Sequence, residues 1–125
     1  AWQVEVDIEI DPDVTAGVLL FYDSALYAGL GFDRDRFVTH QYGLERGRPA
    51  NPHGGRMWLR MTNDRHVVTF HHSTDGRLWT KFDRQMEVSG YHHNVRGGFM
   101  ASRPALYAAG AGEARFRDFR YRALP

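Results

Sequence analysis

The 125-residue sequence has no cysteine, only one lysine and no long hydrophobic run. Without cysteine the chain cannot form a disulfide, bind zinc through thiolates or use a thiol nucleophile. The longest apolar run, Ala16–Phe21, is far too short to cross a membrane as a helix. Lys and Arg number 16 against 15 Asp and Glu, which leaves no concentrated basic face for nucleic acid or an anionic membrane. We therefore expect partners of neither kind.

A convincing amphipathic helix is also missing, and short strand-like segments fill the sequence instead. Trp2–Ile10 alternates apolar and polar residues without a break, which is typical of a strand with one buried face. Similar segments follow between turn residues, about ten in all. A chain of 125 residues has room for one core and one domain. The pattern therefore predicts an all-β fold, an antiparallel β-sandwich or jelly roll, over residues 1–125.

One segment near the middle of the chain predicts a β-hairpin. Val67–His72 has strand composition, and Leu78–Phe82 returns to apolar and aromatic residues. Between them, Asp75 can bond its own backbone and Gly76 accepts the positive φ that a tight turn requires. We expect this hairpin in the middle of a sheet, with Trp79 in the core.

The chain closes with a strand over Glu113–Tyr121. Phe116 and Phe119 are three residues apart, so they cannot share one face of a regular strand. An extra residue near Asp118 would bring them back into phase, and we expect a β-bulge there.

Three stretches of the sequence resemble a known family. They are AGVLLFYDSALYAGLGFD, MWLRMTNDRHVVTFHHSTDGRLWTKFD and GGFMASRPALYAAGAGEARFRDFRY. Together they resemble the C-terminal concanavalin A-like domain of glycoside hydrolase family 43 β-xylosidases and arabinofuranosidases, also classed as carbohydrate-binding module family 91. The most specific parts are F-x-x-S-T-D-G-x-x-W at Phe70–Trp79 and A-x-F-x-x-F-x-Y at Ala114–Tyr121. The resemblance covers essentially the whole chain and implies a concanavalin A-like jelly roll.

This resemblance implies an accessory domain excised from a longer glycoside hydrolase. The family carries its catalytic carboxylates on a five-bladed propeller that this sequence does not contain. The implied function is therefore non-catalytic binding of xylan or xylo-oligosaccharides, with the catalytic propeller of the parent enzyme as a partner. An alternative is a structural domain that packs on the propeller and binds no sugar by itself.

Sugar recognition needs aromatic ring faces for C–H groups and planar polar groups for hydroxyls. The loop 91–96 offers both, and in similar xylosidases a loop at this position leans over the catalytic pocket. Strand aromatics such as Tyr22 and Tyr27 could add a platform, although most aromatics in a small sandwich belong to the core. The predicted carbohydrate-binding residues are Tyr91, His92, His93, Asn94, Arg96, Tyr42, Trp58 and Gln41. The alternative interpretation of the loop is a solvent-exposed turn.

Glu5, Asp7 and Glu9 form E-x-D-x-E on one face of the first strand. This pattern resembles the catalytic signature of another concanavalin A-like group, the family 16 glucanases and xyloglucan-modifying enzymes, whose two Glu act as nucleophile and acid/base. Retaining hydrolysis needs carboxyls about 5 Å apart, whereas residues four apart on a strand start about 13 Å apart at Cα. A solvated acidic face is the favoured interpretation. A compact hydrolase using Glu5 and Glu9 is the alternative function.

No cofactor is expected to be required. A structural Ca²⁺ is possible, because related sandwiches often carry one and because Glu113 and Asp118 could supply oxygen ligands. The sequence has no compact D-x-D-x-D-G loop that would hold the ion by itself.

Overall fold

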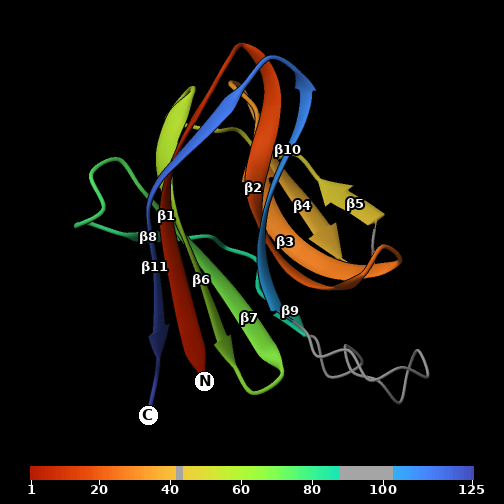
Figure 1. Cartoon of the computed structure of the whole chain (residues 1–125), viewed down its shortest axis with the longest axis vertical. Coiled ribbons are helices and arrows are strands. Elements are labelled where there is room, and N and C mark those ends of the chain that lie inside the picture. Colours follow the sequence, from red (N-terminus) through yellow and green to blue (C-terminus); the bar gives the residue numbers. More distant parts are fainter. Residues whose placement is uncertain (42–43, 88–102) are drawn as a thin grey trace.

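Strands account for every regular element that the computed structural model describes, which covers residues 1–41, 44–87 and 103–125, without side chains for 44–47 and 87. They pair antiparallel into two facing sheets (Figure 1). Sheet A has the order β11-β1-β6-β7-β8, with β9 also paired to β7, and sheet B has the order β10-β2-β3-β4-β5. The strands are β1 (Trp2–Ile10), β2 (Asp13–Asp23), β3 (Leu26–Phe32), β4 (Phe37–Gln41), β5 (Leu44–Gly47), β6 (Arg56–Asp64), β7 (Val67–Ser73), β8 (Thr80–Lys81), β9 (Met86–Glu87), β10 (Arg103–Ala111) and β11 (Ala114–Ala123). The predicted all-β sandwich is confirmed, and no helix in these ranges is long and apolar enough to cross a membrane.

The core forms where the alternating strands turn their apolar sides toward each other. Val4, Val6 and Ile8 of β1 are at most 1% exposed, and the polar residues between them point outward. From the opposite sheet, β2 adds Tyr22, which is 2% exposed. Tyr22 therefore belongs to the core and offers no sugar platform. Further core residues are Val18, Leu20, Leu30, Phe32, Met57, Leu59, Met61 and Phe70.

The predicted hairpin forms between β7 and β8, but it lies at the end of sheet A instead of its middle. Side chains bind the backbone within its turn: the Gly76 amide donates to the Ser73 hydroxyl (2.9 Å) and the Arg77 amide to the Asp75 carboxylate (2.8 Å). The strand ladder resumes only at Thr80, opposite His72. This leaves two residues for β8, too few to hold a central place.

Trp79 corrects a second expectation about this hairpin. The Arg60 guanidinium lies 4.1 Å from the centre of its ring. Arg60 points outward from sheet A, because its neighbours Leu59 and Met61 are in the core. Trp79 is therefore a half-buried residue of the outer surface, and the expectation that it belongs to the core was wrong.

The predicted bulge in the closing strand is confirmed. Asp118 has a positive φ of 57°, and the pairing of β11 with β1 shifts register between Arg117 and Arg120. The inserted residue restores the phase of the strand, so Phe116 and Tyr121 pair with core residues of β1.

Candidate functional site

The three acidic residues of β1 point outward from sheet A, where arginines from both neighbouring strands bind them. Arg60 Nη2 lies 3.0 Å from Glu5, and Arg56 Nη2 lies 2.8 Å from Asp7. On the other side, Arg117 reaches Glu9 at 3.0 Å. This column of carboxylates is ion-paired: Glu9, with its side chain 37% exposed, fits the expected solvated acidic face, whereas Glu5 (16%) and Asp7 (5%) are largely covered.

Ion pairing also lowers the proton affinity of Glu9. Hydrogen bonds from Arg117 and Arg115 lower the pKa of Glu9 below its ordinary value of 4.5. A general acid at neutral pH needs the opposite, a carboxyl whose pKa is raised. The geometry is that of an ion-pair ladder, and it disfavours the hydrolase that Glu5 and Glu9 suggested.

The predicted sugar-binding residues are not brought together where the structure describes them. Tyr42, Tyr91, His92, His93, Asn94 and Arg96 lie outside the described residues. Trp58 lies on the outer face of sheet A, where the Arg120 guanidinium is 5.3 Å from its ring and the backbone of Gly76 packs against it. Gln41 ends β4 in the other sheet. Trp58 and Gln41 therefore do not share a site.

The residues proposed for Ca²⁺ have other contacts. The Glu113 amide donates to Asp11 (2.9 Å), and the Glu113 carboxylate lies 3.8 Å from Arg115. Asp118 occupies the bulge of β11. The described residues contain no group of three or more His, Asp or Glu suited to a metal ion. Calcium binding at Glu113 and Asp118 stays a prediction.

The outer face of sheet B differs, because aromatic and glycine residues cover it. Tyr107 of β10 pairs with Gly17 of β2, which in turn pairs with Gly31 of β3. The Tyr107 side chain crosses both glycines and reaches β4, where its hydroxyl lies 3.0 Å from His40 Nε2. One tyrosine thus links the first and fourth strands of the sheet across its surface.

Glycine is required beneath this tyrosine. A Cβ on Gly31 would collide with the Tyr107 hydroxyl, and a Cβ on Gly17 would collide with the Gly31 backbone. A Cβ on Gly29, in the next row, would collide with the backbone of Val18. The three glycines therefore form a flat floor on which an aromatic ring can lie against the sheet.

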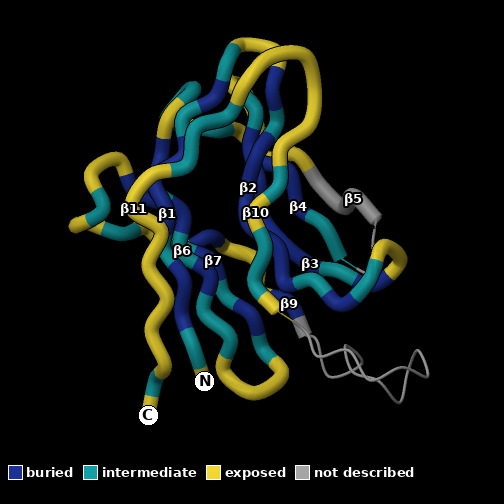
Figure 2. The backbone as a smooth tube through the Cα atoms, viewed as in Figure 1, coloured by how far each residue is buried: buried dark blue, intermediate teal, exposed yellow. Residues whose placement is uncertain are grey.

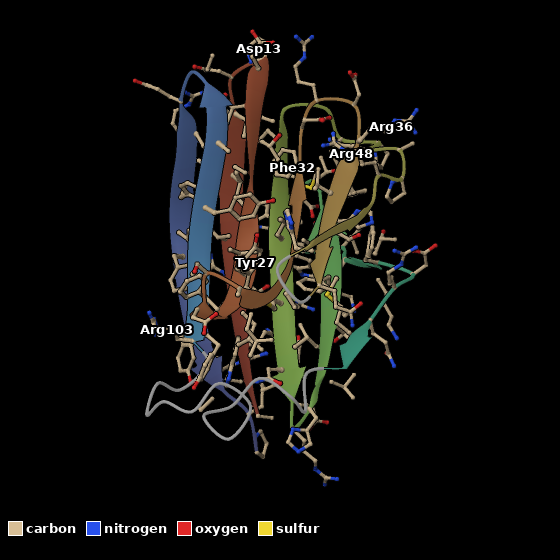
Figure 3. The ribbon with its side chains drawn as sticks, turned by 90° about the vertical axis from the view of Figure 1, so that its right-hand side faces the viewer. Asp13, Tyr27, Phe32, Arg36, Arg48 and Arg103 are labelled. Carbon is tan, nitrogen blue, oxygen red and sulfur yellow. The ribbon has the colours of Figure 1, made fainter. Side chains whose placement is uncertain are left out.

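Beside this floor lies a hollow of about 440 Å³, within the size range of small-ligand sites. Its lining residues come from β2, β3, β4, β10 and the β2–β3 turn: Leu19, Phe21, Ser24, Tyr27, His40 and Tyr107. Figure 3 looks onto this face, with Tyr27 near its middle and Arg103 toward the lower end of β10. None of the six lining residues is a carboxylic acid.

The rings of the hollow form a continuous series. Phe21 and Tyr27 stack at 6.3 Å, and Tyr27 lies 5.9 Å from His40. His40 meets Tyr107 edge-on at 5.4 Å, and the Arg103 guanidinium lies 5.4 Å from the Phe21 ring at the other end. Such a surface offers apolar ring faces with polar groups at its margins, the combination that binds flat, hydroxylated ligands.

Of these residues, only Tyr27 was considered from the sequence. One signal pointed to Leu19 and Phe21: β2 is apolar in nearly every position, which is typical of a strand covered on both faces. The pairing of His40 with Tyr107 had no sequence signal, because the residues are 67 positions apart.

A pair of histidines lies away from this hollow, between the segment before β6 and the inner side of β7. His53 Nε2 lies 2.7 Å from His72 Nδ1, and His53 Nδ1 lies 3.2 Å from the Thr74 hydroxyl. Burial lowers the pKa of both imidazoles below 6.5. At neutral pH the pair is therefore uncharged and holds this segment against the sandwich.

Comparison with known proteins adds the family. The description "Beta xylosidase C-terminal Concanavalin A-like domain" matches residues 1–122. The chain belongs to this family. A comparison with proteins of curated function gave no match.

Solved structures share the fold of this β-xylosidase C-terminal domain. A mutant of the GH43 protein BlXynB from Bacillus licheniformis is 18% identical with a TM-score of 0.81, and xylan beta-1,4-xylosidase from Bacillus halodurans is 15% identical with a TM-score of 0.81. In both cases the match covers 98% of this chain and 27% of the other. A functionally unknown protein from Saccharomyces cerevisiae is 14% identical, has a TM-score of 0.69, and is matched over 99% of this chain and 70% of its own. The predicted concanavalin A-like fold is confirmed, in a chain that spans about a quarter of the two bacterial proteins.

Proposed function

We propose that this chain is a non-catalytic carbohydrate-binding module that recognises xylan or xylo-oligosaccharides, accessory to a β-xylosidase or arabinofuranosidase. The observation that carries the proposal is the hollow on the outer face of sheet B, lined by a series of aromatic rings. The choice of xylan rests on the family and on the xylosidase relatives.

The chemistry of the hollow suits a neutral sugar chain. Tyr27 and Phe21 present ring faces on which the C–H groups of a pyranose can stack. Ser24 and the His40–Tyr107 pair supply hydroxyl and imidazole groups for sugar hydroxyls. No carboxylate lines the hollow. A neutral ligand that covers it therefore does not have to remove a carboxylate from water, which would cost free energy.

The same features argue against hydrolysis. Glycoside cleavage generally uses two carboxyl groups, one of them with a raised pKa. The hollow has none among its lining residues, and the carboxylates of β1 are bound by arginines on the opposite side of the sandwich.

The test is calorimetric titration of the chain with xylohexaose, with cellohexaose and laminarihexaose as specificity controls. We expect saturable heat with xylohexaose and no release of reducing ends. Tyr27→Ala should weaken binding about tenfold or more, because truncating an aromatic anchor removes its stacking surface. Leu78→Ala is the matched control, since Leu78 is 81% exposed on the turn of sheet A, and its affinity should stay within twofold.

Three results would contradict the proposal. Absence of heat with every oligosaccharide would favour a domain that only packs on a catalytic partner. Binding that Tyr27→Ala and Leu78→Ala affect equally would place the sugar elsewhere. Release of reducing ends that Glu5→Gln abolishes would establish the hydrolase alternative.

A further inference from the structure

The flank formed by β10 and β11 leaves part of the core open. Each is the last strand of its sheet, and β11 is drawn mostly as exposed in Figure 2. Leu106, Phe119 and Tyr121 are 37%, 47% and 57% exposed. Their cross-strand neighbours are core residues: Leu106 pairs with Val18 and Tyr121 with Val4, both 1% exposed. Side chains of the inner face are thus uncovered along this flank.

The outward side of β11 carries a column of arginines. Its members are Arg115, Arg117, Arg120 and Arg122, which the bulge keeps on one face. Arg115 and Arg117 bind Glu9 of β1. Among the described residues, Arg120 and Arg122 have no carboxylate partner, although Arg120 lies over Trp58. The column therefore holds more positive charge than β1 neutralises.

The outer edge of β11 has no strand beside it in the described structure. Its backbone N–H and C=O groups on that side are available for a further strand. The bulge at Asp118 interrupts the edge, and Phe119–Ala123 is the regular run that follows it.

We propose that Phe119–Ala123 is a docking edge for an extended segment of a partner polypeptide in which apolar and acidic residues alternate. The partner's acidic residues would lie beside Arg120 and Arg122, and its apolar residues would cover Phe119 and Tyr121. The added strand would extend sheet A by one, with backbone hydrogen bonds supplying affinity and charge selecting the sequence.

The other edge of β11 already shows this recognition within the chain. β1 pairs there with its acidic residues against the arginines and its apolar residues in the core: Glu5 is opposite Arg120, and Val4 is opposite Tyr121. A second copy of the chain fits less well, because two β11 strands side by side would place arginine columns against each other.

The probe is a capped, fluorescently labelled peptide that alternates valine and glutamate over nine residues. Its controls are the same peptide with lysine for glutamate, and a peptide of identical composition with the two residue types in separate blocks. We expect saturable binding of the alternating acidic peptide by fluorescence anisotropy. Hydrogen exchange should show new amide protection in Phe119–Ala123.

Charge reversal tests the assignment. In the double variant Arg120→Glu and Arg122→Glu, the acidic peptide should bind at least tenfold more weakly and the lysine peptide at least tenfold more tightly. Arg77→Glu is the matched control on an exposed turn residue, with affinities within twofold. Arg120 lies over Trp58, so its replacement could also change stability, and the thermal unfolding of each variant is therefore compared with that of the wild type. The single variant Arg122→Glu leaves this contact intact. It should also weaken binding of the acidic peptide and tighten binding of the lysine peptide.

Several outcomes would overturn the proposal. One is equal binding of the acidic, lysine and block peptides. Another is amide protection outside β11. A third is a concentration-dependent dimer of the wild-type chain that protects the same edge without peptide, which would make a second copy the occupant. None of these results depends on xylan binding, so this proposal and the proposed function can fail separately.

Discussion

The two outer faces of this sandwich differ in the side chains that they present to water. On sheet A, a column of carboxylates lies between arginines of β6 and β11, and every charge of β1 has a partner. On sheet B, three glycines and a series of rings replace the charges. The paired carboxylates of β1 offer no free acidic group to a neutral ligand, whereas an apolar floor with polar margins can be covered by the rings and hydroxyls of a sugar. The second face is therefore the better candidate for binding.

The largest effect should come from breaking the floor of sheet B. Gly17→Val places side-chain atoms against the backbone of Gly31, which cannot move without disturbing the ladder. We expect a loss of about 3 kcal/mol in the free energy of unfolding, measured by urea denaturation, together with loss of xylohexaose binding. In the control Gly55→Ala, the new Cβ meets its nearest atom at 3.4 Å. Its stability should change by less than about 1 kcal/mol. Similar small effects of both changes would contradict the close approach at Gly17.

A smaller loss should follow when the ladder of sheet A is broken. Glu5→Gln leaves Arg60, whose side chain is 22% exposed, without its carboxylate. The expected cost is about 1–2 kcal/mol in urea denaturation. Glu113→Gln should have no measurable effect, because the Glu113 side chain is 81% exposed. Xylohexaose affinity should be unchanged in both variants, and a fall in affinity with Glu5→Gln would show that the two faces are not independent.

Acid should destabilise the domain in two separate pH windows. The imidazoles of His53 and His72 have pKa values lowered by burial, so the unfolded chain binds more protons below pH 6.5. Their contribution is complete above that pH and is lost as pH falls toward the lower folded values. The pKa of Glu9 is lowered from 4.5 by Arg117 and Arg115, so its contribution is present above pH 4.5 and is lost as pH falls through the lower folded value.

Thermal unfolding between pH 8 and pH 3 checks both windows. His53→Gln should flatten the decline that begins near pH 6.5, and it should leave the acidic decline in place. Glu9→Gln should do the reverse. If neither variant changed the profile, the two groups would not be the source of the acid sensitivity.

The smallest effect should be that of salt, which tests the ion pairs of sheet A and the hollow of sheet B separately without a mutation. Raising the salt concentration from about 0.1 M to about 1 M shortens the Debye length from about 10 Å to about 3 Å. The midpoint of urea unfolding should fall slightly in the wild type and less in Glu5→Gln. Binding of a neutral xylo-oligosaccharide on sheet B should not change, and a clear loss of sugar affinity in salt would point to a charged site.

The elements of the fold were predictable where the evidence was local. The alternation of Trp2–Ile10 placed β1 and its core side, and the spacing of Phe116 and Phe119 located the bulge at Asp118. Local evidence did not predict that the β7–β8 hairpin lies at the edge of sheet A or that Trp79 lies on the outer surface. Both depend on which distant strands and side chains lie beside the segment.

The candidate site was less predictable for the same reason. Tyr27 was recognisable as an aromatic on a strand, but its value for binding depends on Phe21 across the turn and on His40 of the next strand. The acidic motif of β1 resembled a catalytic signature until the partners of Glu5 and Glu9 were known. Those partners lie on β6 and β11, far away in the sequence: Arg117 binds Glu9 from the opposite end of the chain.

The sequence alone therefore determined the fold class and the inner and outer side of most strands, because a period of two is a property of neighbouring residues. The tertiary structure alone decided which outer face carries ion pairs and which carries a hollow. Antiparallel register sets those contacts, and it aligns Glu5 with Arg60 and Tyr107 with Gly17, residues that are far apart along the chain.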